Sequence, residues 1–256
     1  MSFSSAANSA PAITVKNLVK TFGAFYALRN ISLQIAPGEC VTIFGPNGAG
    51  KTTFLRLLAA ISRPSGGEIL IDGQPLREAT LSHHRRLGVI GHQSFLYDDL
   101  TAAENLLFYA KLYDVPNPAS RVNEVLTEVG LRERAADRVR AFSRGMQQRL
   151  TIARAMLHQP SLLFLDEPYT GLDQHAASML TGWLQQLRSE RRTILLITHD
   201  LEQGLALADR IVIFCAAKSH GKNPRANLTK PLCGRPILTW WPVRPQTRGA
   251  RHEPLA

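Results

Sequence analysis

The stretch Gly45-Pro46-Asn47-Gly48-Ala49-Gly50-Lys51-Thr52 decides the fold of this chain. It fits the pattern G-x-x-x-x-G-K-[ST], in which backbone N–H groups cradle phosphates, the lysine adds a mobile cation and the hydroxyl reaches Mg²⁺. The apolar, β-branched run 41–44 before it predicts a buried strand, and apolar residues at helical spacing over 54–61 predict a helix after it. Strand, glycine loop and helix in this order predict a nucleotide-phosphate site rather than a plain glycine turn.

The size and composition of the chain are those of a globular protein. It has 256 residues, of which 45% are hydrophobic, enough for one large domain or two small ones. No segment approaches the roughly 20 uninterrupted apolar residues of a spanning helix, so we expect no membrane span. Residues 1–12 lack the basic start and apolar core of a signal peptide, and we expect a flexible N-terminus there. The cysteines at 40, 215 and 233 are too far apart to indicate a disulfide framework, which favours a reducing cytoplasm.

The net charge of +10 is concentrated at one end of the chain. Residues 216–256 hold eight of the 30 Lys and Arg and one of the 20 acidic residues, a net charge of +7 that leaves +3 for the rest. The same segment holds six prolines and shows no helical or strand periodicity. We therefore expect a basic, proline-rich, disordered tail, and no nucleic-acid partner for the body of the protein.

Further strands and helices are predicted by local patterns. Continuous apolar runs indicate strands buried on both faces, as in a parallel sheet. We expect strands over 13–15, 31–35, 41–44, 68–71, 87–90, 162–165, 193–198 and 211–214. Thr101 and Glu104 form a capping box before a helix that Pro116 and Pro118 end, and Ser143 and Asp200 are in position to cap two later helices. A helix is also expected over 174–188.

Three more motifs follow the glycine loop in a definite order. They are Phe142-Ser143-Arg144-Gly145-Met146, Asp166-Glu167-Pro168 at the end of an apolar strand, and His199 after the next strand. This ordered set resembles the ATP-binding-cassette (ABC) ATPases over about residues 13 to 214. The resemblance implies an α/β P-loop NTPase of ABC type over 13–215, with a parallel-sheet core, an N-terminal antiparallel β subdomain and a helical signature subdomain at about 95–158.

The resemblance also implies a role for each motif residue in binding Mg²⁺ and ATP. Phe22 matches the aromatic that stacks on adenine, although Tyr26 is a rival and a plain core aromatic is the alternative. Mg²⁺ would be held by Thr52, Gln93 and Asp166. The phosphates would be bound by the loop and the start of its helix, namely Gly45, Pro46, Asn47, Gly48, Ala49, Gly50, Lys51, Thr52 and Thr53.

Catalysis, by the same resemblance, needs two copies of the chain. Glu167 matches the residue that polarises the attacking water, Gln93 matches the glutamine that reaches both Mg²⁺ and that water, and His199 matches the histidine on the γ-phosphate. Asp173 belongs to the loop that crosses between protomers. The signature residues that meet the opposite protomer's nucleotide are Ser143, Arg144, Gly145 and Met146, of which Arg144 and Met146 depart from the commonest form, Leu-Ser-Gly-Gly-Gln. A homodimer is implied.

The expected partner is an integral membrane permease on another polypeptide, with this chain peripheral at the cytoplasmic face of the inner (plasma) membrane. Three stretches, 90–93, 100–106 and 166–173, resemble the ATPase of the cytochrome c maturation haem exporter. The alternatives are an exporter ATPase for a drug, lipid or polysaccharide, a soluble ABC ATPase outside transport, and a small-molecule kinase. We expect His92 and the run 83–86 to be structural rather than haem or metal ligands.

Overall fold

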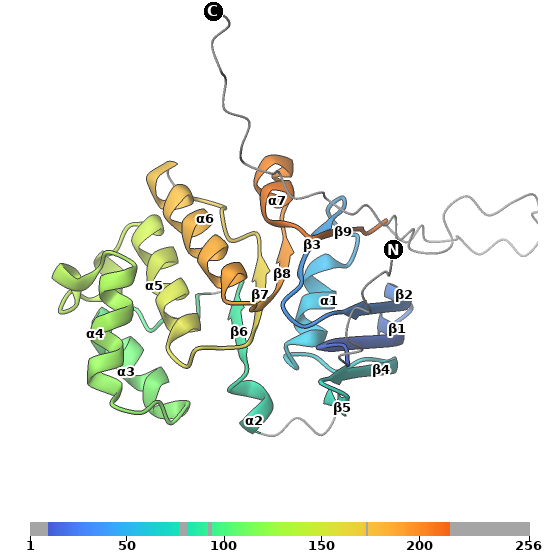
Figure 1. Ribbon diagram of the computed structural model, residues 1–256, viewed down its shortest axis with the longest axis horizontal. Helices are drawn as coiled ribbons and strands as arrows, with labels where there is room; N and C mark the ends of the chain where they lie inside the picture. The colour runs from blue at the N-terminus through green and yellow to red at the C-terminus, as the bar shows by residue number, and fades with distance from the viewer. Residues whose placement is uncertain (1–9, 77–80, 92–93, 173, 216–256) are drawn as a thin grey trace, which may run out of the picture.

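A computed structural model describes residues 10–76, 81–91, 94–172 and 174–215 of the chain. It consists of an antiparallel sheet, a parallel sheet with helices beside it, and a group of helices at one end (Figure 1). No helix within these ranges has the length and apolar character needed to cross a bilayer. The predicted disorder of 216–256 lies outside the described residues. Ala12, at the end of the expected flexible segment, is buried and accepts a hydrogen bond from the Asp72 N–H.

The antiparallel sheet has the order β2-β1-β4-β5. Strands β1 (Ile13–Phe22) and β2 (Phe25–Ile35) form a hairpin, and β4 (Gly66–Ile71) and β5 (Gln74–Pro75) complete the sheet. The first two strands are longer than predicted, because residues 16–22 extend β1 and residues 25–30 extend β2 up to a two-residue turn. Gly23 opens that turn with φ +57°, which glycine adopts at little steric cost.

The parallel sheet confirms the prediction drawn from the continuous apolar runs. Its order is β6-β7-β8-β3-β9, and every neighbouring pair is parallel. The strands are β6 (Leu87–Ile90), β7 (Leu162–Asp166), β8 (Thr193–Ile197), β3 (Cys40–Phe44) and β9 (Arg210–Ile213). Because β7, β8 and β3 are consecutive in the sheet, their carboxyl ends bring together three loops that lie far apart in the sequence.

Three helices begin directly after the residues that were predicted to cap them. Thr101 and Glu104 form the reciprocal capping box, Ser143 accepts the Met146 N–H, and Asp200 accepts the Gln203 N–H. Pro118 does not end a helix but starts one at its first position, where its missing N–H has no intrahelical partner to lose. The helices are α1 (Lys51–Leu58), α2 (Leu81–His84), α3 (Ala102–Leu112), α4 (Pro118–Glu128), α5 (Arg144–Met156), α6 (Gln174–Ser189) and α7 (Leu201–Leu207), with short 3₁₀ turns at Arg132–Arg134 and Val139–Ala141.

Strand β7 is shared by two apolar cores. Leu162 and Phe164 point into the core between the two sheets, where they join Phe54 of α1. Leu163 and Leu165 point the other way, into the core formed with α3, α4, α5 and α6. This alternation follows from the two-residue period of a strand. The end of β7 is therefore fixed from both sides.

His158, just after α5, makes stability depend on pH. Its Nε2 lies 3.0 Å from the Leu87 carbonyl oxygen, its ring stacks on Tyr113, and burial lowers its pKa from 6.5 to about 4. As pH falls, the histidine of the unfolded chain is therefore protonated before that of the folded chain. The contribution of neutral His158 to the unfolding free energy is complete above pH 6.5 and is lost as pH falls toward 4. Between pH 7 and pH 5 we expect the wild-type protein to lose about 2 kcal/mol of unfolding free energy more than His158→Gln. Urea denaturation of both proteins at the two pH values measures this, and equal losses would contradict it.

Candidate active site

The glycine loop is held in a shape that only glycine permits at two of its positions. Gly45 has φ +151°, and a Cβ there would lie 2.3 Å from the Phe214 carbonyl oxygen. Gly50 has φ +89°, and its Cβ would lie 2.6 Å from the Ala27 carbonyl oxygen of β2. Both contacts are far inside van der Waals distance, so the loop closes against β2 and the end of β9. These close backbone contacts set the curvature of the loop.

Lys51 is the first residue of α1 and lies against this loop. Its side chain is buried, and Nζ donates to the carbonyl oxygens of Gly45 at 2.6 Å and Pro46 at 3.0 Å. The ammonium group thus lies beside the backbone that would surround a phosphate. Thr52 and Thr53 follow, half-buried, in the first turn of the helix, whose N-terminus adds the positive end of its dipole. The arrangement suits a polyphosphate.

Asp166, the last residue of β7, provides an oxygen suited to a divalent cation. The residue is 4% exposed, and its Oδ1 is buried without a hydrogen-bond partner among the described residues. It lines a cavity of about 230 Å³ together with Thr52, Gly91 and Phe95. A buried carboxylate oxygen beside a hydroxyl fits Mg²⁺, which prefers hard oxygen ligands. Gln93, the third predicted ligand, lies outside the described residues.

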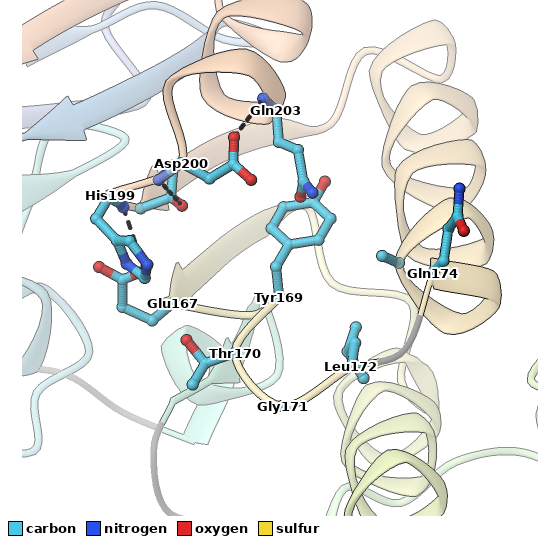
Figure 2. A pocket seen from close by; sticks show the side chains of 11 residues that line it. Glu167, Tyr169, Thr170, Gly171, Leu172, Gln174, His199, Asp200 and Gln203 are labelled. Carbon is cyan, nitrogen blue, oxygen red and sulfur yellow. Dashed lines mark hydrogen bonds and ion pairs between the residues drawn. The ribbon is translucent and has the colours of Figure 1, made fainter.

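Glu167 and His199 meet across neighbouring strands. Glu167 Oε2 lies 2.7 Å from His199 Nδ1 and accepts the His199 backbone N–H at 3.3 Å (Figure 2). The Glu167 side chain is 15% exposed and the His199 side chain 76%. With the carboxylate ionised, Nδ1 carries the shared proton and Nε2 is the nitrogen left for a substrate. The pair borders a cavity of about 480 Å³ that Tyr169, Thr170 and Gln203 also line.

The backbone at Glu167 is unusual for a residue with a side chain. Its φ is +53°, in the left-handed region, and its N–H donates to the Ile197 carbonyl oxygen of β8 at 2.8 Å. This conformation costs on the order of 1 kcal/mol and turns the chain sharply at the end of β7. The turn directs the Glu167 carboxylate toward the end of β8, which is what allows it to reach His199.

The aromatic residues predicted near the nucleotide lie at the turn that joins β1 to β2. Phe22 is 57% exposed, so the alternative that it is a core aromatic is wrong. Tyr26 is 41% exposed, but the Arg29 guanidinium covers its ring at 4.2 Å from the centroid. Phe25, which the sequence analysis did not single out, is paired with Phe22 across the turn and is 54% exposed. The position of Phe25 directly after the turn Gly23-Ala24 is the sequence feature that could have indicated it.

The signature residues lie away from the glycine loop of their own chain. Ser143 is exposed and caps α5, and Arg144, Gly145 and Met146 form the first turn of that helix. Helix α5 belongs to the helical group, and strands of the parallel sheet lie between it and α1 (Figure 1). Asp173, predicted for the loop between protomers, lies outside the described residues. The structure therefore places Thr52 and Asp166 on one cavity and Glu167 against His199 on another, and it leaves the signature residues apart from the glycine loop.

Comparisons with known proteins agree with this geometry. A family model described as ABC transporter matches residues 28–170. The chain is 40% identical over 190 residues to the ABC transporter ATP-binding protein NatA of Bacillus subtilis (strain 168), covering 73% of this chain and 77% of NatA. It is 35% identical over 208 residues to the Nod factor export ATP-binding protein I of Cupriavidus metallidurans, covering 80% and 69% of the two chains.

A solved structure shows the same fold. The dimeric, post-hydrolysis state of the ATP-binding cassette MJ0796 bound to ADP and Pi superposes with a TM-score of 0.73, at 28% identity, over 79% of this chain and 94% of that one. The family match covers more than half of the chain and includes the glycine loop, the signature segment and the Asp166-Glu167 pair. Fold, site and relatives agree that the chain is an ATP-binding, ATP-hydrolysing subunit and belongs to the ABC transporter family.

Proposed function

We propose that two copies of this chain hydrolyse Mg-ATP between them and so drive export through a separate membrane subunit. One observation carries the proposal: the buried, unpartnered Asp166 oxygen and the Glu167 carboxylate stand next to each other at the end of β7. The glycine loop with Lys51 follows β3, two strands away in the same sheet. A metal ligand and a water-polarising base thus stand near a phosphate loop.

The residues divide the work of phosphoryl transfer. Lys51 exchanges its two carbonyl partners for phosphate oxygens, while loop N–H groups and the start of α1 bind the rest of the phosphate charge. Thr52 and Asp166 would hold Mg²⁺, which would neutralise charge that develops on the phosphates. Glu167 orients the attacking water, and His199 holds that carboxylate in place through Nδ1 and presents Nε2 to the γ-phosphate.

Dimerisation supplies the signature residues that a single chain cannot bring to its own site. ATP should convert the hydrolysis-deficient variant Glu167→Gln from monomer to dimer, doubling its mass in light scattering. Adding Ser143→Asp should abolish that change, because aspartate keeps the helix cap but places a negative charge against the γ-phosphate. Adding Ser143→Thr, which keeps both cap and hydroxyl, should leave the dimer intact. A Glu167→Gln protein that stays monomeric with ATP would contradict dimerisation by the chain alone.

An exposed apolar surface on the helical group is our proposed contact with the permease. It consists of Phe95, Tyr97, Phe108 and Leu112, which are 44%, 49%, 43% and 57% exposed. Tyr97 and Phe108 pack edge-to-face at 5.3 Å, so their rings form one continuous apolar area. Such clusters of exposed aromatics are typical of protein interfaces. A short amphipathic helix of the membrane subunit is the occupant that we propose.

Phe108→Asp should detach the chain from membranes without impairing its chemistry. We expect at least a fivefold fall in the fraction that sediments with membranes of the source cells, with ATP hydrolysis of the purified chain within twofold of wild type. Leu201→Asp is the matched control, since Leu201 is 62% exposed on α7, outside the proposed contact. Equal sedimentation of the two variants would contradict this docking surface. Sedimentation of the wild-type protein itself tests the proposed peripheral association with the membrane.

The transported compound is a finer proposal. Three stretches of the chain resemble the haem exporter ATPase, whereas the relatives named above are NatA and a Nod factor export protein. These names favour the alternative of an exporter for a drug, lipid or polysaccharide. Stimulation of ATP hydrolysis by haem, in vesicles that hold the chain with its permease, would support the haem substrate. Stimulation by one of the other classes alone would support the alternative.

A further inference from the structure

Arg154 of α5 is a buried cation without a buried anion. It is 8% exposed, and it forms no ion pair with any carboxylate of the described residues. Its Nη2 donates to the Val89 carbonyl oxygen at 2.9 Å, while Nε is buried and unpartnered. Burial lowers the pKa of the guanidinium. A charge kept out of water in this way is unfavourable for stability, so packing alone gives no reason for an arginine here.

The Val89 carbonyl is available because β6 is the edge strand of the parallel sheet. The carbonyl of Arg86, the residue just before β6, accepts the Leu162 N–H of β7. Carbonyl directions alternate from one residue to the next along a strand. The Leu87 and Val89 carbonyls therefore face away from β7, toward α5. His158 and Arg154, four residues apart and on one side of that segment, reach these two oxygens. Side chains of α5 and of the residues just after it thus pair with carbonyl groups that another strand would bind if β6 were not at the edge.

Arg154 also holds the chain on the far side of Gln93. Its guanidinium carbon lies 5.4 Å from the Phe95 ring centroid and 5.2 Å from that of Tyr109 on α3. The Tyr109 hydroxyl in turn donates to the Phe95 carbonyl oxygen. Val89 precedes Gln93 by four residues and Phe95 follows it by two. One side chain therefore contacts both flanks of this segment.

Both flanks border the cavity of Thr52 and Asp166. Val89 and Phe95 line it together with Thr52 and Asp166, the residues to which we assign Mg²⁺. We propose that Arg154 is a positioning residue for ATP hydrolysis, which fixes Val89 and Phe95 and thereby one wall of the metal cavity without touching the nucleotide. This inference rests on the metal placement given under the proposed function. This position needs a side chain that is both charged and flat, because it must donate a hydrogen bond to Val89 and contact two aromatic rings at the same time.

Arg154→Met in the full chain separates positioning from packing, because methionine has similar bulk and removes an unpaired buried charge. We expect the midpoint of thermal unfolding to stay within a few degrees and the KM for ATP within about twofold. The kcat should fall at least tenfold, and hydrogen exchange of amides in 87–91 should quicken at least tenfold while α1 is unchanged. Tyr109→Phe, which keeps the ring but frees the Phe95 carbonyl, should give a smaller loss of kcat.

Arg149→Met is the matched control on the same helix. Arg149 also donates to backbone carbonyls, those of Val129 and Gly130, but these lie within the helical group and away from β6. Its kcat and the exchange in 87–91 should match wild type.

Wild-type kcat and exchange in Arg154→Met would overturn the inference. If that variant does not fold, Arg154→Lys keeps the charge without the flat stacking surface, and full kcat in both Arg154→Lys and Tyr109→Phe would overturn it equally. Asp166→Asn tests the metal placement by itself, because it should remove the effect of Mg²⁺ on ATP affinity. If that effect persists, the metal placement fails, and exchange in 87–91 still reports whether Arg154 holds this strand.

Discussion

Glu167→Gln should bind Mg-ATP as the wild-type protein does and lose at least about a hundredfold in steady-state hydrolysis, the range associated with a general base. The amide has the shape of the carboxylate and can still accept the His199 N–H, so the turn after β7 should persist. It has no charge with which to polarise water. Phosphate release under saturating ATP, beside nucleotide affinity from fluorescence titration, measures the two effects separately.

Glu202→Gln is the control for this result. Glu202 is exposed on α7, three residues after His199, and should give wild-type turnover when changed. Near wild-type hydrolysis in Glu167→Gln would remove Glu167 from the catalytic role. Loss of ATP binding together with hydrolysis would instead show that the carboxylate supports the loop conformation.

Gly50→Ala should weaken ATP binding by at least tenfold and lower the stability of the nucleotide-free protein. The new Cβ would lie 2.6 Å from the Ala27 carbonyl oxygen and 2.7 Å from Leu28 Cδ2, at a φ of +89°. Left-handed backbone alone costs an alanine about 1–2 kcal/mol, and relief of the contact must move either β2 or the start of α1 with Lys51. Either movement changes the loop.

Gly48→Ala separates the cost of a left-handed backbone from the cost of the contact with β2. Gly48 has a similar φ of +79°, but its Cβ would meet no atom within 4 Å. We expect it to lose only the strain of the left-handed backbone, about 1 kcal/mol in the unfolding free energy without nucleotide. Chemical denaturation of both variants and the wild type gives the comparison. Equal losses would show that the contact with β2 is unimportant.

Sequence alone predicts those features that depend on neighbouring residues. The glycine loop, the caps of α3, α5 and α7 and the buried strands were predicted because each is a local pattern. The length of β1 was missed because its pairing shifts register between Val15 and Leu18 and again before Lys20, which interrupts the two-residue alternation. The pattern at Pro118 predicts a helix stop, but proline also suits the first helical turn, where it stands in α4.

The parts of the site that sequence could not supply depend on sheet order. Glu167 and His199 are 32 residues apart, and their contact exists because β7 and β8 are neighbours. Arg154 was overlooked for a related reason. On a helix, an arginine among apolar residues is normally exposed, and only the edge position of β6 and the rings of Phe95 and Tyr109 make a buried place for it.

The two apolar cores that share β7 have a consequence for folding. Because Leu163 and Leu165 serve the helical group while Leu162 and Phe164 serve the sheets, neither half can melt without exposing one face of the same strand. The described chain should therefore unfold as one cooperative unit, without an intermediate that retains one half alone. Melting of one core alone would expose a face of β7 to water, so we expect rearrangements during turnover to move packed elements as rigid units.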